Sequence, residues 1–300
     1  MNGIIIIDKP QEWTSNDVVS RLRRVFNTRR IGHGGTLDPM ATGVLPVFVG
    51  RATRGVEFFE HAEKVYEATL RFGLPTDTED ITGKVLTENE VSLTENDLLA
   101  VLPKFRGDIL QVPPMYSAIK VGGRKLVDIA REGGEAERRP RQVTIHSIDA
   151  EKLSCDTYSL RVSCSKGTYI RTLCADIGKK LGCGAAMSAL RRTETGGFTL
   201  SDAYTVEQLE AMTAEQRQAL VLPTESLFTE LDAVEIPQFY ANLFLSGAPL
   251  YQKKLRVSIP EGKLIRVKHK GEFLGLGRAD TLSDASAVLK PEKLFRLEKV

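Results

Sequence analysis

The feature that most constrains the fold is a series of short strand-like segments that does not alternate regularly with helices. Gly3–Asp8 is an almost continuous apolar run, typical of a buried strand, and Val65–Phe72 alternates apolar and polar residues, typical of a half-buried one. Helical segments lie between such strands, without a strand–helix–strand rhythm. The pattern therefore predicts an α+β fold, with a mixed, mainly antiparallel sheet and flanking helices.

Three hundred residues suffice for one large domain or two unequal ones. After about Leu231 the pattern changes to short strands separated by glycine turns. These strands are expected at Leu255–Ile259, Leu264–His269 and Glu272–Ala279, with Leu294–Glu298 as a further candidate. We therefore expect residues 1–230 to form one domain and residues 232–300 to form a second, small β-barrel.

Three helices have recognisable starting signals. Ser15 is expected to cap a helix that extends to about Phe26. Thr94, with Asp97 three residues later, has the pattern of a weak capping box and predicts a helix to Leu102. A third helix is expected over Thr168–Leu181, after a Lys-Gly turn.

Composition excludes several classes of protein. Hydrophobic residues make up 42% and charged residues 27% of the chain, which is ordinary for a globular protein and excludes a disordered or collagen-like chain. The apolar run Ile4–Ile7 is far shorter than the ~18 residues of a membrane helix. No basic leader precedes it, so we expect a cytoplasmic protein. The four cysteines fit no zinc spacing, and Cys164 and Cys174 are expected to be buried free thiols.

The formal net charge of +2 hides an uneven distribution. Basic residues outnumber acidic ones by seven to two in Asn16–Arg54 and by seven to one in Lys253–Lys270. Acidic residues outnumber basic ones by eleven to three in Glu57–Asp97. Separate basic segments on a nearly neutral chain indicate a polyanionic partner that contacts chosen surfaces. An unevenly charged, solvated surface is the alternative.

The segment Gly32–Gly43 is the first candidate for chemistry. Its four glycines allow the backbone to approach a ligand closely and to adopt positive φ angles. Asp38 lies within this basic neighbourhood, and we expect nearby arginine to keep it ionised with a low pKa. Such a carboxylate can act as a nucleophile or a base at an anomeric carbon. The segment matches neither a Walker loop nor a dinucleotide-binding loop, and an ordinary glycine-rich turn is the alternative.

The segment Gly32–Leu45, with the sequence GHGGTLDPMATGVL, closely resembles the catalytic motif of the TruB family of tRNA pseudouridine synthases. Further segments resemble motifs of this family and follow the family order: Gly3–Pro10 with Thr14–Asp17, Lys64–Gly73, Gln111–Lys120, Ser165–Leu173, and Leu190–Arg192 with Gly197 and Phe198. One departure is Glu12, at a position where the family pattern predicts glycine.

The resemblance implies a fold and an activity. The expected fold is a pseudouridine-synthase core with a thumb-like insertion at about residues 115–141 and a PUA-like C-terminal domain. The expected reaction isomerises uridine to pseudouridine at position 55 in the tRNA T-loop, by breaking the N-glycosidic bond of a flipped-out base and forming a carbon–carbon bond at the same sugar. No cofactor or metal is needed. The expected partners are the T-arm and acceptor stem of tRNA, bound by a monomer.

The resemblance also implies roles for individual residues. Asp38 matches the essential carboxylate, which either attacks the sugar or removes a sugar proton, and Arg171 matches its ion-pair partner. Tyr66 matches the tyrosine that stacks on the flipped base and serves in proton transfer. The expected substrate-binding residues are His33, Tyr169, Leu190, Lys9 and Lys166. Among these, Lys9 is expected to brace the catalytic loop and Lys166 to contact backbone or phosphate.

Two alternative functions remain open at the level of sequence. One is a tRNA-binding folding chaperone whose catalysis is dispensable, and the other is the guide-RNA-dependent archaeal and eukaryotic type of relative. The presence of Asp38, Tyr66 and Arg171 favours a working enzyme over a chaperone. The short chain and the complete insertion favour the stand-alone bacterial type.

Overall fold

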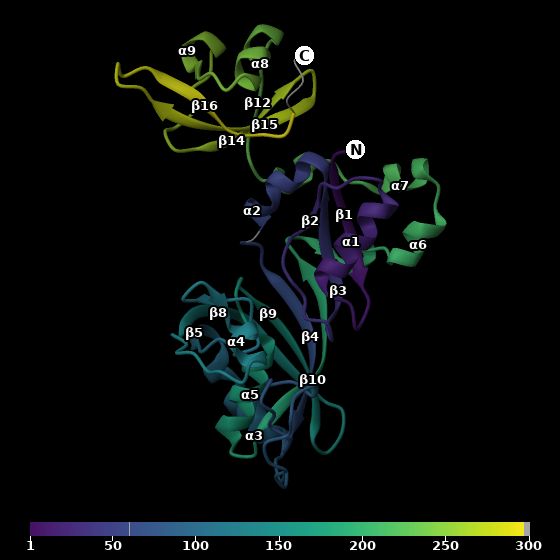
Figure 1. Ribbon diagram of the computed structural model, residues 1–300. Helices are drawn as coiled ribbons and strands as arrows, with labels where there is room; N and C mark the ends of the chain where they lie inside the picture. Colours follow the sequence, from purple (N-terminus) through teal and green to yellow (C-terminus); the bar gives the residue numbers. More distant parts are fainter. Residues whose placement is uncertain (60, 297–300) are drawn as a thin grey trace.

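The computed structural model describes residues 1–59 and 61–296, and their strands form a nine-stranded, a five-stranded and a two-stranded sheet (Figure 1). The main path of the large sheet is β1-β3-β10-β4-β9-β8-β5. Its strands are β1 (Gly3–Lys9), β3 (Thr42–Val49), β10 (Ala185–Thr195), β4 (Lys64–Phe72), β9 (Thr157–Cys164), β8 (Arg141–Lys152) and β5 (Gly107–Gln111), with β2 (Ile31–His33) on β3 and β11 (Phe198–Thr199) on β10.

Every neighbouring pair in this sheet is antiparallel except β3 and β10, which pair in parallel through Thr42 and Gly43. The predicted mixed, mainly antiparallel α+β fold is therefore confirmed. Gly43 is required at this junction: its φ is 102°, and a Cβ there would lie 2.2 Å from the carbonyl oxygen of Arg192. The parallel contact brings the loop before β3 next to β4 and β10.

Helices cover the sheet at several points. Helix α1 (Ser15–Val25) packs against β2 and α6 (Val206–Ala211), α5 (Ile170–Leu181) packs against β10, and α3 (Glu95–Val101) packs against α5. The remaining helices are α2 (Val56–Phe59), α4 (Leu126–Arg131), α7 (Ala214–Leu220), α8 (Gln238–Leu245) and α9 (Gln252–Leu255). No helix of the described ranges is both long enough and apolar enough to cross a bilayer.

The cap of α1 differs by one residue from the prediction. Thr14 is the N-cap: its hydroxyl accepts from the Asp17 amide at 3.1 Å, and the Asp17 carboxylate accepts from the Thr14 amide at 2.8 Å. The Ser15 hydroxyl is buried instead and accepts from the Leu37 amide at 2.9 Å. Ser15 thus fastens α1 to the loop that carries Asp38. The capping box of Thr94 and Asp97 at α3 is confirmed.

Glu12 adopts a φ of 68°, in the left-handed region that favours glycine. The backbone path that a glycine would take is therefore kept, with the conformational strain of a side chain there. The Glu12 amide donates to the Pro39 carbonyl at 2.8 Å. The substitution changes the residue without separating this turn from the Asp38 loop.

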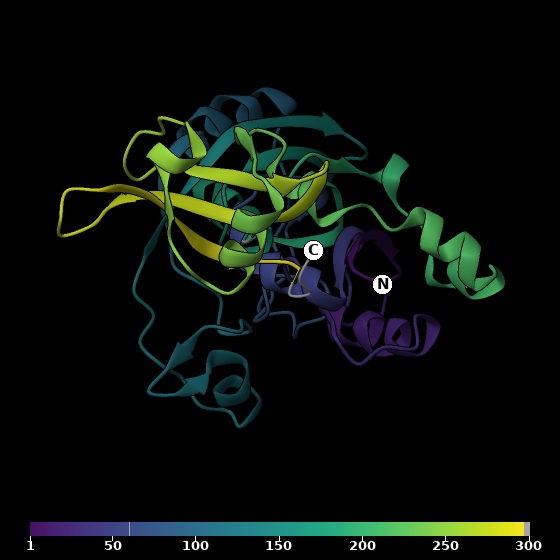
Figure 2. The ribbon, with the colours of Figure 1, turned by 90° about the horizontal axis from the view of Figure 1, so that it is seen from above.

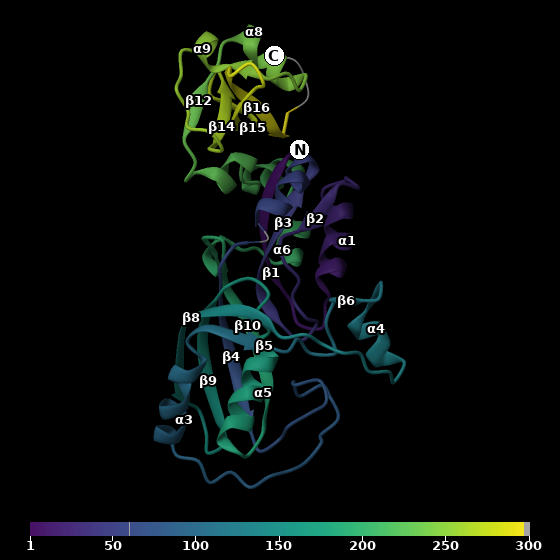
Figure 3. The same ribbon diagram turned by 90° about the vertical axis from the view of Figure 1, so that its left-hand side faces the viewer.

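The insertion contains the small hairpin of β6 (Lys120–Val121) and β7 (Arg124–Lys125), followed by α4. It projects sideways from the large sheet, as the view from above and the side view both show (Figures 2 and 3). An extended return segment then leads into β8.

The C-terminal sheet has the order β12-β14-β15-β16-β13, an open half-barrel arrangement. Its strands are β12 (Ala233–Glu235), β14 (Leu264–His269), β15 (Glu272–Thr281), β16 (Ala287–Leu294) and β13 (Leu250–Tyr251). The expected strand at Leu255–Ile259 is wrong, because Leu255 ends α9 and Arg256 turns the chain with a φ of 58°. The candidate strand Leu294–Glu298 begins where β16 ends, and its last two residues lie outside the described part of the chain.

Aromatic packing joins the C-terminal sheet to the rest of the chain. Phe228 lies 5.5 Å from Phe58, 5.9 Å from Phe273 and 5.7 Å from Phe295, measured between ring centroids. Close by, the Glu225 carboxylate pairs with Arg266 at 2.9 Å and with Lys268 at 3.0 Å. These contacts combine apolar burial with ion pairs that are largely shielded from water.

Candidate active site

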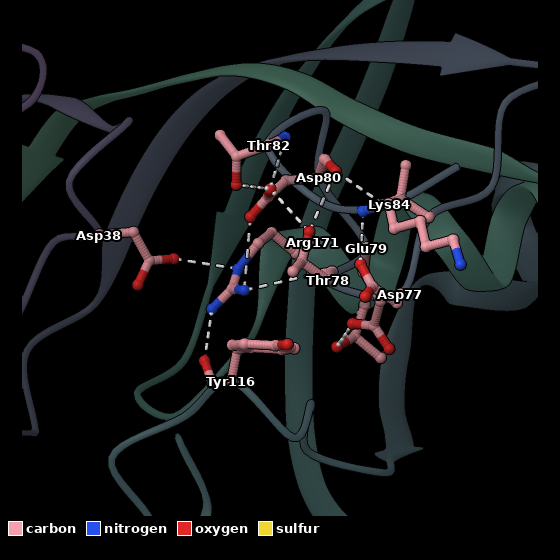
Figure 4. Close-up of polar contacts among 11 residues, drawn as sticks. Asp38, Asp77, Thr78, Glu79, Asp80, Thr82, Lys84, Tyr116 and Arg171 are labelled. Carbon is pink, nitrogen blue, oxygen red and sulfur yellow. Dashed lines mark hydrogen bonds and ion pairs between the residues drawn. The ribbon is translucent and has the colours of Figure 1, made fainter. Parts of the chain in front are cut away.

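A pocket of about 420 Å³ opens where the β2–β3 loop, β4, the base of the insertion and the start of α5 meet. Its lining includes Gly34–Asp38, Tyr66, Tyr116–Ala118, Lys166–Arg171 and Leu190. The parts of the chain that resemble separate family motifs therefore meet at one place. Figure 4 shows Asp38 and Arg171 with their side chains directed toward each other.

Arg171 is the ion-pair partner of Asp38. The Arg171 Nε lies 3.0 Å from the Asp38 Oδ2, and the Asp38 side chain keeps 39% of its surface exposed. Arg171 itself is 5% exposed and lies in the first turn of α5, whose backbone fixes its direction. No described residue bonds to the other carboxylate oxygen of Asp38, so one oxygen is oriented while the other is free to meet a ligand.

The remaining donors of Arg171 are also used (Figure 4). Nη1 donates to the Thr78 carbonyl at 3.2 Å and lies 3.4 Å from the Asp80 Oδ2, and Nη2 donates to the Tyr116 carbonyl at 2.9 Å. The guanidinium is thus held by two carboxylates and two carbonyls. Such complete pairing is what a buried charge requires.

Asp80 is a site residue that the sequence analysis missed. It is 4% exposed, and its Oδ1 accepts from the Thr78 hydroxyl at 2.9 Å and from the Thr82 amide at 3.0 Å. The only signal in the sequence is the alternation of threonine with acidic residues in Thr76–Thr82, which is equally typical of a polar turn. Asp80 is buried by contact with Arg171 of α5, 91 residues later in the chain, so the local sequence pattern could not reveal it.

The expected low pKa of Asp38 is wrong in direction. Burial raises the pKa of this carboxyl, and the nearby Asp80 charge raises it further, against the opposing effects of Arg171 and Lys9. The arginines are visible in the sequence, whereas the desolvation of Asp38 and its proximity to the Asp80 carboxylate result from the fold. Asp38 is therefore a carboxylate whose basicity is increased by its surroundings.

Tyr66 is buried on β4 and forms part of the pocket wall. It is the cross-strand neighbour of Arg192 on β10. Burial raises the pKa of the Tyr66 hydroxyl, and the positive charge of Arg192 opposes that increase. The tyrosine is therefore protonated at neutral pH and can act as a hydrogen-bond donor.

Lys9 lies outside the pocket lining and braces the loop, as predicted. It is 0% exposed, and its Nζ donates to the carbonyls of Pro10 at 2.7 Å, Trp13 at 2.6 Å and Pro39 at 3.3 Å. Pro39 follows Asp38 directly, so this ammonium group fixes the backbone next to the carboxylate. Burial lowers the Lys9 pKa to about 8.

The other predicted residues divide into two groups. Tyr169, Leu190 and Lys166 line the pocket. The Tyr169 backbone is fixed by Gln111, which accepts from its amide at 3.0 Å and donates to its carbonyl at 3.2 Å. His33 lies on β2 and is not part of the pocket lining. Its Nδ1 is buried and has no hydrogen-bond partner among the described residues.

The cysteines and acidic groups are the side chains that could hold a metal ion. Cys164 and Cys174 are buried and unpaired, as expected, and burial raises their thiol pKa values to about 11 and about 12. Within residues 1–59 and 61–296, no three histidine, cysteine or acidic side chains are grouped as metal ligands. The chemistry available in the pocket is that of a carboxylate, a phenol and cationic groups.

Replacing Asp80 by asparagine should lower the pKa of Asp38, because a neighbouring negative charge is removed while the Asn oxygen can still accept from Thr82. A pH titration of the carboxyl carbons by NMR measures this shift. We expect a stability loss of about 1–3 kcal/mol in urea unfolding, from the weakened contact to Arg171.

The matched control is Asp77→Asn. Asp77 belongs to the same turn and accepts from the Lys84 amide at 2.7 Å without contacting Arg171. This control should leave the Asp38 pKa unchanged. An Asp38 pKa that stays constant or rises in Asp80→Asn would contradict the coupling of the two carboxylates through Arg171.

Comparisons with known proteins agree on one family. Residues 23–170 match the model described as TruB family pseudouridylate synthase (N terminal domain), and residues 171–229 match the tRNA pseudouridylate synthase B C-terminal domain. The chain is 41% identical to tRNA pseudouridine synthase B of Clostridium tetani, covering 93% of this chain and 96% of the relative. For the Azoarcus sp. protein of the same name, the identity is 43% and the coverage 98% and 95%.

A solved structure supports the same assignment. The chain is similar to a chain of the "Crystal Structure of a Cbf5-Nop10-Gar1 Complex", with a TM-score of 0.72, 29% identity, and coverage of 98% of this chain and 85% of the other. Sequence identity over nearly the full length, the matching family models and the shared fold lead to one conclusion. This chain belongs to the TruB family of pseudouridine synthases and is an enzyme that isomerises uridine in tRNA.

Proposed function

We propose that the uridine converted by this enzyme is that at position 55 in the T-loop of tRNA, and that Asp38, Tyr66 and Arg171 carry the reaction. The observation that supports this most strongly is the Asp38 carboxylate, oriented by Arg171 through one oxygen and exposed to the pocket through the other. The family activity gives the reaction, and the pocket geometry supports the proposed roles.

The pocket suits a base that has left its stack. Its volume of about 420 Å³ lies in the range of small-molecule sites, and the Tyr66 ring and the Leu190 side chain form apolar walls. Extruding a uridine costs a few kcal/mol, which stacking against an aromatic ring helps to recover. We assign Tyr66 to stacking and proton transfer, and Leu190 and Tyr169 to contact with the nucleotide.

Asp38 then acts at the sugar, either as the nucleophile or as the base that removes a sugar proton. Its raised pKa increases its proton affinity and its basicity, while the contact with Arg171 favours the ionised form. The isomerisation returns the base to the same sugar, so no leaving group is released and there is no net oxidation or reduction. The carboxylate of Asp38 and the phenol of Tyr66 at the pocket support this assignment.

We further propose that residues 1–230 are the catalytic domain and residues 232–300 a PUA-like RNA-binding domain, with the insertion at about residues 115–141 folding over the T-arm. A cavity of about 360 Å³ at the insertion, separate from the pocket beside Asp38, supports this role, because its lining includes the basic residues Lys120, Arg138, Arg139 and Arg141. Guanidinium groups suit bidentate contact with phosphates.

The C-terminal basic segment offers fewer free cations than the sequence count suggested. Arg266 and Lys268 pair with Glu225, and Lys263 pairs with Asp232 at 2.5 Å. The remaining four cations form no ion pair with a described residue and are exposed: Lys253, Lys254, Arg256 and Lys270. We assign contact with the acceptor stem to these four.

Asp38→Asn should lower the turnover number by about 10²–10⁴-fold. The tRNA affinity should stay within about threefold of the wild-type value, because affinity comes mostly from phosphate and stacking contacts. Pseudouridine mapping of an unmodified tRNA transcript measures turnover, and filter binding measures affinity. Substantial pseudouridine formation by this variant would reject the assigned role. A wild-type protein that binds tRNA without converting it would favour the chaperone alternative.

Tyr66→Phe should keep the stacking face and lose the hydroxyl, so affinity should remain and turnover should fall by about 10²–10⁴-fold. Tyr66→Leu, as the comparison variant, should lose affinity as well, by about 1–3 kcal/mol. Single-turnover rates and dissociation constants on the same transcript separate the two effects. Equal rates for Tyr66→Phe and wild type would show that the hydroxyl takes no part in the chemistry.

Replacing Lys253 and Lys254 together by glutamine should weaken binding of full-length tRNA and leave binding of an isolated T-arm hairpin unchanged. Each lost phosphate contact should reduce the slope of log affinity against log salt by about 0.9. The matched control is Lys263→Gln, whose cation already pairs with Asp232. Equal weakening on hairpin and tRNA would contradict a separate acceptor-stem surface.

A further inference from the structure

Arg192 is a second buried arginine near the pocket. Carboxylates neutralise the charge of Arg171, but none neutralises that of Arg192 among the described residues. Arg192 is 0% exposed, and no carboxylate of residues 1–59 and 61–296 pairs with it. Nε donates to the Val44 carbonyl at 2.7 Å and Nη2 to the Gly35 carbonyl at 3.2 Å, while the buried Nη1 has no hydrogen-bond partner among the described residues. An uncompensated buried charge is costly, so its retention calls for an explanation.

The unpaired Nη1 lies directly behind the pocket wall. A Cβ added to Gly35 would be 3.5 Å from the Arg192 Nη1 and 3.9 Å from the Lys64 Cε. Gly35 and Lys64 both line the pocket. Since Gly35 has no side chain, the guanidinium and the lysine stem flank the same small space beside the Asp38 loop.

Lys64 brings a second positive charge to this side of the pocket. Its Nζ donates to the Ala62 carbonyl at 2.6 Å and forms no ion pair with a described residue. Lys166 lines the same pocket, so three cations gather here, and none of them forms an ion pair with a carboxylate of the described residues. Burial, Arg192 and Lys166 together lower the Lys64 pKa to about 8, which leaves it mostly protonated at neutral pH.

The positive charge restricts the class of ligand that this wall can bind. A uracil carbonyl would satisfy one hydrogen bond and leave the excess charge in place, whereas an anion would also offset the buried guanidinium. The family substrate is RNA, and a flipped nucleotide carries a phosphate on either side of its sugar. We propose that Lys64, with the buried charge of Arg192 behind Gly35, binds a backbone phosphate next to the target uridine.

This inference rests on the proposed function and adds a phosphate subsite to it. The test is the binding of T-arm hairpins in which the linkage 5′ or 3′ to the target uridine is an uncharged methylphosphonate. The methylphosphonate hairpins carry a 2′-O-methyl group next to the neutral linkage to protect it from cleavage. Each is compared with a hairpin that has the ordinary phosphodiester and the same 2′-O-methyl group. We expect one of the two neutral linkages to weaken wild-type binding by about tenfold, the effect of losing one charged hydrogen bond.

Lys64→Gln should weaken binding of the phosphodiester hairpins by about the same factor. Its affinity should not fall further when the linkage that matters for the wild-type protein is made neutral. Lys64→Arg should retain most of the affinity, and Lys152→Gln, an exposed lysine away from the pocket, is the matched control. The proposal is overturned if neither neutral linkage weakens wild-type binding, or if Lys64→Gln loses the same factor on every hairpin. Pseudouridine formation by wild-type protein on an unmodified hairpin tests the proposed function separately.

Discussion

The guanidinium of Arg171 joins four segments that are distant in sequence. It contacts Asp38 from the loop before β3, Asp80 and the Thr78 carbonyl from the turn after β4, and the Tyr116 carbonyl at the base of the insertion, while its own backbone belongs to α5. The loss of one of these contacts would leave a charge or a donor incompletely paired in a buried environment, which costs free energy. The Arg171 side chain therefore links the segments that line the pocket.

The two buried arginines of the site illustrate opposite arrangements. Arg171 meets two carboxylates and two carbonyls, so its charge is neutralised within the protein and its position is fixed in the absence of substrate. Arg192 donates to two carbonyls, pairs with no carboxylate of the described residues, and has a buried Nη1 without a hydrogen-bond partner among them. A rigid group suits the alignment of the Asp38 carboxylate for the role that we propose, and an uncompensated one suits a ligand that brings its own negative charge.

Much of the fold could be predicted from local pattern. Alternation predicted the strand at Val65–Phe72, which extends to Lys64 in the structure. The cap residues predicted the helices near Ser15 and after Thr94, although the N-cap of the first is Thr14. The expected strand at Leu255–Ile259 failed because a short apolar run does not distinguish a strand from a helix end. The residues of the catalytic motif could be located by resemblance, since each is carried by a contiguous motif.

What sequence could not supply was the balance of charges in three dimensions. Asp80 belongs to an acidic stretch whose sequence is typical of a solvated surface, yet it is buried in contact with Arg171 of α5. The direction of the Asp38 pKa depends on that burial, and the number of free cations in the C-terminal sheet depends on Glu225 and Asp232. Each of these facts results from contact between segments far apart in the chain.

The bond from Arg171 to the Tyr116 carbonyl has a consequence for substrate selection. Tyr116 lies at the base of the insertion, so the segment that we propose to fold over the T-arm is attached to the group that orients Asp38. An RNA that seats the insertion poorly would disturb this attachment and so the carboxylate, even when its overall affinity is high. Discrimination between RNAs would then arise in the turnover number more than in the dissociation constant, as in induced fit.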